Sequence, residues 1–140
     1  MHDYTALTFD EMETAFGGVW IRARASLGAS AFGLQVTTLP PDSGDMYPAH
    51  THNHDGQEEI YLLLDGAAEM ELPDASVTMD RETMIRVGPT TPRRIRSGPA
   101  GCRFLIIGAT PGQGYTPPPE TELGGPETLD ESALVESVQA

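Results

Sequence analysis

The stretch of sequence that decides the fold is GDMYPAHTHNHDGQEEIYLLLDG, residues 44–66. His50 and His52 stand two positions apart, so on an extended strand both side chains point to the same face. Glu59 begins an apolar run that ends at Asp65-Gly66, a dipeptide typical of a two-residue hairpin turn. Two imidazoles and one carboxylate brought together across a turn form a facial metal site. Such a site suits non-haem Fe(II) and leaves coordination positions open for substrate.

The same residues carry a resemblance to a known family. The spacing of glycine, His-x-His, glutamate and closing glycine is similar to the first motif of the cupin superfamily, here Gly44, His50, His52, Glu59 and Gly66. A second reading starts the motif at His52-x-His54, which shortens the gap before Glu59 but moves His50 and Gly44 out of register. His54 therefore stays open as an alternative ligand. The resemblance implies a double-stranded β-helix, the jelly-roll barrel of cupins, with a bound divalent metal ion.

The second cupin motif is changed in this chain. Its matching stretch is residues 89–94, PTTPRR, where Thr91 replaces a glycine and Arg94 replaces the histidine that supplies the fourth metal ligand. Arginine keeps its proton in proteins and so cannot bind a cation. A guanidinium about 4 Å from a divalent ion would repel it by roughly 8 kcal/mol at an effective dielectric near 20. Either Arg94 turns away, or an anionic ligand lies between it and the ion, or no metal binds.

Composition restricts the partners. The 140 residues carry 21 acidic and 8 basic side chains, a formal charge of −13, and every basic residue is arginine. This balance argues against binding to nucleic acid or to an anionic membrane surface. A single cysteine excludes an internal disulfide and is typical of the reducing cytoplasm. No apolar run is long enough to predict a transmembrane helix. The sequence therefore predicts a cytoplasmic protein.

The pattern along the chain predicts an all-β protein of three parts. Residues 1–18 form a lead-in with a short helix, for which Thr8 and Glu11 have the spacing of a capping box. Residues 19–110 form the barrel, and residues 111–140 form a tail rich in proline and glycine that is extended, then helical or disordered. Short apolar runs separated by glycine and proline predict the barrel strands. These strands are expected at residues 19–25, 33–39, 60–64, 73–80, 83–87, 93–97 and 103–107.

The hairpin predicted at Asp65-Gly66 assigns side chains to two faces. One face should line the barrel interior as an apolar pocket with one carboxylate at its mouth, and it carries Glu59, Tyr61, Leu63, Ala68, Met70 and Leu72. The opposite face carries three large aliphatic side chains, Ile60, Leu62 and Leu64. Because three such residues should not all be exposed, we expect a cover. A homodimer is the expected cover, and an N-terminal segment is the alternative.

Two functions follow from these observations. In the first, His50, His52 and Glu59 hold Fe(II), Mn(II), Ni(II) or Zn(II), and the chain is an enzyme such as a dioxygenase, isomerase, decarboxylase or lyase. Glu59 and Tyr61 are its candidate catalytic residues. A small, anionic substrate would be bound by Arg94, Arg96, Tyr61 and Met70. In the second, the chain is a non-catalytic module that binds a small molecule, and the metal site is vestigial, with Arg94 paired to Glu59.

Overall fold

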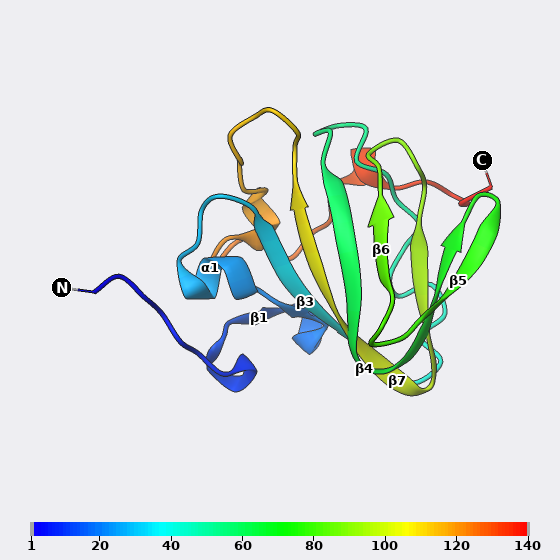
Figure 1. Cartoon of the computed structure of the whole chain (residues 1–140), viewed down its shortest axis with the longest axis horizontal. Coiled ribbons are helices and arrows are strands. Elements are labelled where there is room, and N and C mark those ends of the chain that lie inside the picture. Colours follow the sequence, from blue (N-terminus) through cyan, green and yellow to red (C-terminus); the bar gives the residue numbers. More distant parts are fainter. Residues whose placement is uncertain (1, 140) are drawn as a thin grey trace.

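The computed structural model describes residues 2–139, and antiparallel strands make up most of its regular secondary structure (Figure 1). The seven strands are β1 (Thr14–Ala15), β2 (Trp20–Ile21), β3 (Gly33–Leu39), β4 (Glu58–Leu72), β5 (Ala75–Met79), β6 (Met84–Val87) and β7 (Arg94–Ala109). One α-helix, α1 (Ala23–Leu27), and four 3-10 turns complete the described part, at Phe9–Glu11, Phe16–Gly18, Pro119–Thr121 and Glu131–Ala133. The prediction of an all-β jelly roll is confirmed.

The sheet has the strand order β1-β2-β3-β7-β4-β5, and β6 pairs with the first half of β4. The two long strands, β4 and β7, run antiparallel and pair along nearly their whole length, from Glu58 opposite Ala109 to Glu71 opposite Arg94. Both bend near their middle, where the register shifts around Asp65 and Gly66. Each long strand therefore contributes to both ends of the barrel.

The prediction of a hairpin at Asp65-Gly66 is wrong, because strand β4 continues through these two residues. Gly66 has a φ of 77°, the left-handed value that the dipeptide signals. This conformation serves a bulge, and Gly66 packs so closely on β7 that an added Cβ would lie 2.1 Å from the carbonyl oxygen of Gly101. The break expected between residues 97 and 103 is absent too, because β7 runs through it without interruption. The expected strands 93–97 and 103–107 are parts of the single strand β7.

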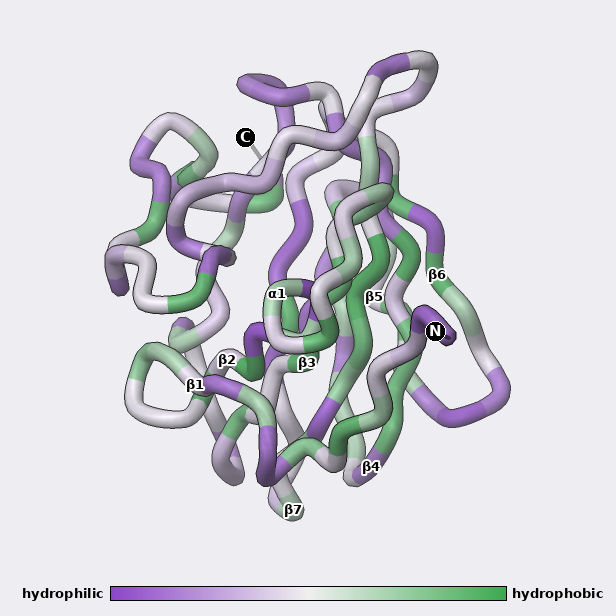
Figure 2. Tube along the Cα trace, turned by 90° about the vertical axis from the view of Figure 1, so that its left-hand side faces the viewer, coloured by the Kyte–Doolittle hydropathy of each residue, from purple (hydrophilic) through white to green (hydrophobic). Residues whose placement is uncertain are grey.

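The interior face of β4 was nonetheless assigned correctly. Glu59, Tyr61, Leu63, Ala68 and Met70 are all buried, and only Leu72 is half-buried. They join residues of β7, β6 and β5 in one core, which includes Ile95, Phe104, Ile106, Ile85, Val87 and Met79. Figure 2 shows hydrophobic residues concentrated on the strands and hydrophilic ones along the outer loops. The buried positions change from odd to even numbers across the bulge, and the predicted hairpin implied the same change, so the face could be predicted although the turn could not.

The N-terminal part differs from the prediction. Residues 19–25 form the short strand β2 and helix α1, which ends at Gly28 with a φ of 78°. Arg22 and Arg24 are buried here rather than lying on an exposed strand face. The lead-in helix is a 3-10 turn, in which the Thr8 backbone N–H donates to Glu11 at 3.0 Å.

The N-terminal part covers one end of the outer β4 face. Leu64 packs with a second cluster formed by Met12, Ile21, Ala23 and Val36. Ile60 and Leu62 are half-buried, and their neighbours Ile107 and Met84 are 39% and 68% exposed. The homodimer expected on this face stays a prediction.

The tail packs onto the barrel. Arg22 donates from Nε to the Glu120 carbonyl and from Nη2 to the Gly125 carbonyl, both at 3.1 Å. Further along, Val135 donates to the Ala49 carbonyl at 3.0 Å. Figure 1 shows the tail, in orange and red, crossing the molecule from the side of α1 to the side of β5. The division into residues 1–18, 19–110 and 111–140 stays a prediction. Within residues 2–139 no helix has the length and apolar character needed to span a membrane.

Candidate metal centre

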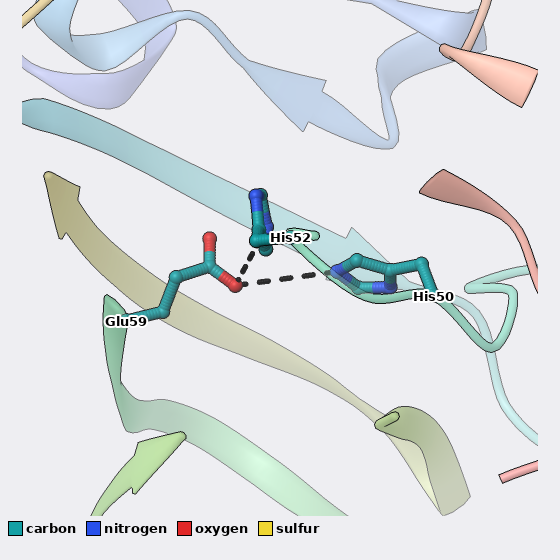
Figure 3. Close-up of side chains that lie close together, drawn as sticks. All are labelled: His50, His52 and Glu59. Carbon is teal, nitrogen blue, oxygen red and sulfur yellow. Dashed lines mark ion pairs between the residues drawn. The ribbon is translucent and has the colours of Figure 1, made fainter. Parts of the chain in front are cut away.

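Three side chains converge at one end of the barrel (Figure 3). His50 and His52 come from the segment that leads into β4, and Glu59 is the second residue of that strand. Glu59 Oε1 lies 3.1 Å from His52 Nε2 and 4.0 Å from His50 Nε2. One ligand atom from each residue lies within 4.8 Å of the other two. The structure therefore brings together the three residues that the sequence motif singled out.

Both imidazole rings are oriented by a contact on their far nitrogen. His50 Nδ1 lies 3.1 Å from the Pro48 carbonyl oxygen, and His52 Nδ1 lies 3.0 Å from Asp55 Oδ1. Each acceptor holds a proton on Nδ1, which leaves the Nε2 lone pair facing Glu59. Histidines that bind metal ions in proteins are oriented by this kind of contact. The donor set and its orientation therefore fit a divalent metal ion.

The backbone around His50 is held on both sides. His50 exchanges two hydrogen bonds with Arg93, each 3.1 Å long, and forms a bridge with Leu134 of the tail on its other side. His52 donates from its backbone to the Pro89 carbonyl at 2.8 Å. The segment that carries both histidines is thus fixed by the loop before β7 and by the tail. These backbone contacts position His50 and His52 before any ion binds.

The Glu59 carboxylate is buried but well supplied with partners. Tyr61 donates its hydroxyl to Glu59 Oε1 at 2.6 Å, and the Tyr47 hydroxyl lies 3.5 Å from that of Tyr61. Burial favours the neutral acid, but the hydrogen bond and charge of His52 outweigh it and lower the pKa of Glu59 to about 2. Burial also raises the pKa of both tyrosines, which stay protonated. Glu59 is therefore an anion over the whole physiological range.

The two histidines differ in their charge. Burial lowers the pKa of His50 to about 4, so its ring is neutral near pH 7. Burial also disfavours the charged form of His52, but the adjacent carboxylates of Glu59 and Asp55 outweigh this and raise its pKa above the ordinary value. When His52 is protonated, it forms an ion pair with Glu59 at 3.1 Å.

Comparison with solved structures decides the fold family. A cupin protein from Bacteroides fragilis superposes with a TM-score of 0.62 and 22% identity, over 83% of this chain and 93% of its own. The chain has the cupin fold. A sugar phosphate isomerase of the cupin superfamily from Silicibacter pomeroyi gives a TM-score of 0.59 and 16% identity over 75% of each chain. A chain from a study of DMSP lyases gives 0.50 and 18% identity, over 58% of this chain and 40% of its own. No family model and no curated protein matches the sequence.

The arginine beside the cluster of His50, His52 and Glu59 is Arg93 and not Arg94. The Arg93 side chain is fully buried, its Nη1 lies 3.8 Å from Glu59 Oε1, and its Nη2 donates to the Gly88 carbonyl at 2.7 Å. Among residues 2–139, its Nε and Nη1 have no hydrogen-bond partner. The match to the second cupin motif missed Arg93, because it aligned the next residue, Arg94, with the histidine that supplies the fourth ligand. Alternation with the buried residue Ile95 was the signal that could have found it.

Arg94 and Arg96 lie on the outer face of β7, so the expectation that they reach the interior is wrong. Arg94 donates to Glu71 Oε2 at 2.7 Å and to Asp45 Oδ1 at 3.2 Å. Arg96 binds the same two acids, reaching Asp45 Oδ1 at 2.8 Å. These four charges form a network in which each arginine is neutralised by neighbouring carboxylates. The contact between Arg94 and Glu59 that the vestigial-site hypothesis required is not formed.

The other predicted residues take different places. His54 does not face Glu59; its Nε2 lies 3.3 Å from Asp55 Oδ2 and 3.6 Å from Asp130 Oδ2. It belongs to a second group of possible ligands, with His52 and Asp55. Tyr61 lies beneath Glu59, and Met70 lies in the core. Neither Tyr61 nor Met70 is one of the described residues that line the pocket beside the cluster. Their predicted contact with a substrate has no support in this arrangement.

A pocket of about 380 Å³ opens beside the cluster and is lined by His50, His52 and Glu59. Its volume is in the range of small-molecule sites. Much of its remaining wall comes from outside the barrel strands, from residues near Phe16 and Trp20 and from the tail between Tyr115 and Leu134. No sequence pattern indicated this wall, because it joins segments about 100 residues apart that share no pattern. The cupin barrel thus supplies the donor atoms, and the two ends of the chain shape the space beside them.

Proposed function

We propose that this chain binds a divalent metal ion through His50, His52 and Glu59 and acts on a small molecule that enters the adjacent pocket. The observation that carries the proposal is the convergence of two imidazole Nε2 atoms on one buried carboxylate, with each Nδ1 already engaged. Two nitrogen donors and one oxygen donor suit Fe(II), Mn(II), Ni(II) and Zn(II). A bound ion would act as a Lewis acid toward a substrate oxygen.

The protein residues have separable roles in this function. His50 and His52 bind, and the Pro48 carbonyl and the Asp55 carboxylate orient their rings. Tyr61 holds the Glu59 carboxylate by donating its hydroxyl, so it positions a ligand without contacting the substrate. The tail and the N-terminal part limit access of water to the pocket. The similar structures include a sugar phosphate isomerase and a chain from a study of DMSP lyases, whose names describe unlike reactions, so the proposal stops at metal-dependent chemistry on a small molecule.

The test is metal content by elemental mass spectrometry after loading the purified, tag-free chain with each of the four metals. The unaltered chain is expected to retain about one ion per molecule, and His50→Ala or His52→Ala to lose it. His54→Ala is the matched control, because it removes the same side chain two positions away and should leave the content unchanged. Loss in His54→Ala with retention in His50→Ala would assign the alternative pair, His52 and His54. No retention by the unaltered chain would overturn the proposal.

A second function has one observation in its favour. Arg93 already places a positive charge 3.8 Å from Glu59, and a protonated His52 places another 3.1 Å away. Because the buried carboxylate is compensated without a metal ion, the barrel could act as a metal-free binding module for a small molecule. Under this alternative, His50→Ala leaves the affinity for a ligand nearly unchanged. Under the metal proposal, the same substitution removes metal and ligand binding together.

A further inference from the structure

The wall of the pocket contains an aromatic pair held in an unusual backbone conformation. The rings of Phe16 and Trp20 lie 4.5 Å apart between centroids, at an interplanar angle of 55°. Both rings line the pocket that also contains His50, His52 and Glu59. Phe16 has a φ of 55°, a left-handed value that is strained for a residue with a bulky side chain. Non-glycine residues held in this way often occur at ligand sites, where the surrounding structure maintains them.

The surrounding structure holds Phe16 from the tail side. Its backbone N–H donates to the Glu127 carboxylate. The loop that carries Glu127 is fixed in turn by Arg22, which is 4% exposed and donates to the carbonyls of Glu120 and Gly125. Glu13 accepts from the Gly124 backbone at 2.9 Å. These hydrogen bonds hold the N-terminal part and the tail together, and they keep the aromatic pair at the pocket.

Several polar groups on the pocket wall are occupied by contacts within the chain, and Arg24 Nε is buried without a hydrogen-bond partner among residues 2–139. Gln57 Nε2 donates to Asp55 at 2.9 Å, and the Thr121 hydroxyl donates to the Pro118 carbonyl at 2.7 Å. Arg24 donates from Nη1 to the Ala29 carbonyl at 2.9 Å. A ligand covered with hydroxyl groups would find few free partners here and would lose its hydrogen bonds to water. Beyond the His/Glu cluster, the wall favours an apolar body.

We infer that the pocket takes a small molecule with an oxygen-donor head group and a flat aromatic body that lies against Phe16 and Trp20. This inference rests on the proposed function for its head group, whereas the aromatic body rests on the wall alone. Offset or tilted contacts between aromatic rings contribute beyond the area that they bury. The oxygen-donor head group reaches the cluster of His50, His52 and Glu59, and the aromatic ring replaces water on the apolar wall.

Two hydroxamates with the same metal-binding head test the inference. Benzohydroxamate carries a phenyl ring, and acetohydroxamate carries a methyl group in its place. Trp20 is the single tryptophan of the chain, so its fluorescence reports directly on this wall. We expect the zinc-loaded chain to bind benzohydroxamate at least about tenfold more tightly than acetohydroxamate, with quenching of Trp20 by the first only. Phe16→Leu should reduce that ratio several-fold without changing the affinity for acetohydroxamate.

Phe32→Leu is the matched control, because Phe32 is 40% exposed and is not among the residues that line the pocket. It should leave both affinities unchanged. Equal affinities for the two hydroxamates in a metal-loaded chain would overturn the aromatic inference and leave the metal site standing. If the chain retains no metal, the proposed function fails on its own. The aromatic wall is then judged by whether benzohydroxamate, and not acetohydroxamate, still quenches Trp20. If Phe16→Leu does not fold, the ratio and the quenching in the unaltered chain decide.

Discussion

Arg93 and Glu59 lie next to each other inside the barrel, with 3.8 Å between Arg93 Nη1 and Glu59 Oε1 and with the arginine side chain fully buried. The guanidinium neutralises the carboxylate in the absence of metal and repels a cation in its presence. Because the same guanidinium stabilises the metal-free protein and opposes metal binding, it sets the balance between the two candidate functions. It also allows one substitution to shift stability and metal affinity in opposite directions.

Arg93→Met is expected to strengthen metal binding at least about tenfold. The Coulomb repulsion between a guanidinium and a divalent ion is roughly 8 kcal/mol at 4 Å and an effective dielectric of 20, so even a fifth of it exceeds the 1.4 kcal/mol of a tenfold change. The metal-free variant should lose about 3 kcal/mol of unfolding free energy, because the buried carboxylate loses a compensating charge. Competition with a chelator measures the first effect, and urea denaturation measures the second.

Arg94→Met is the control for that experiment, one residue further along the chain. Its side chain binds Glu71 and Asp45 on the outer face, so metal affinity should change by less than about twofold. Equal changes in the two variants would show that the effect comes from net charge and not from the buried contact.

Gly66→Ala tests the bulge that replaced the expected hairpin. An added Cβ would lie 2.1 Å from the Gly101 carbonyl oxygen, at a φ of 77° that side chains rarely adopt. We expect the free energy of unfolding to fall by at least about 3 kcal/mol, because the backbones of β4 and β7 would have to separate. In Gly98→Ala the nearest atom is 3.6 Å away, and the loss should stay below about 1 kcal/mol. Similar losses in both variants would mean that the close approach is not required.

The fold was predictable because its signals are local. The His-x-His and glutamate spacing indicated the cupin barrel, and alternation along β4 assigned Glu59, Tyr61 and Leu63 to the interior. The Asp65-Gly66 signal was wrongly interpreted as a hairpin, although Gly66 does have a left-handed φ. A bulge uses the same conformation, and only the pairing with β7, some 35 residues later, decides between the two.

The rest of the site depends on contacts that no local pattern encodes. Arg93 and Arg94 are chemically identical neighbours, and the register of the loop beside His50 selects which one faces Glu59. The pocket wall depends on hydrogen bonds from the buried Arg22 to backbone carbonyls of a tail about 100 residues away. A charged residue on an alternating stretch reads as exposed until its distant partners are known.

Metal affinity is expected to fall as the pH is lowered from about 8 to about 5, by up to about tenfold per unit. Neither Glu59 nor His50 accounts for this fall, because their pKa values of about 2 and about 4 lie below the range. His52 has a raised pKa, so below it the ring holds a proton that the metal must displace. Asp55→Asn removes one carboxylate that raises this pKa and should move the fall to lower pH. Calorimetry in buffers of different ionisation enthalpy measures the released proton, and a pH-independent affinity would contradict the assignment.

Val135→Pro tests whether the tail braces the metal ligands. Val135 donates to the Ala49 carbonyl, and Thr51 donates to the Ala133 carbonyl at 2.8 Å, so the tail pairs with the backbone on both sides of His50. Proline removes the Val135 donor, and loss of a contact that orients a ligand typically weakens metal binding about 10- to 100-fold. Val135→Ala keeps the N–H and is the matched control, with affinity expected to stay within about twofold of the unaltered chain. A lowered unfolding free energy with unchanged affinity in Val135→Pro would show that the tail stabilises the barrel without positioning His50. A fall in affinity confined to the proline variant would place the tail in the support of the metal centre.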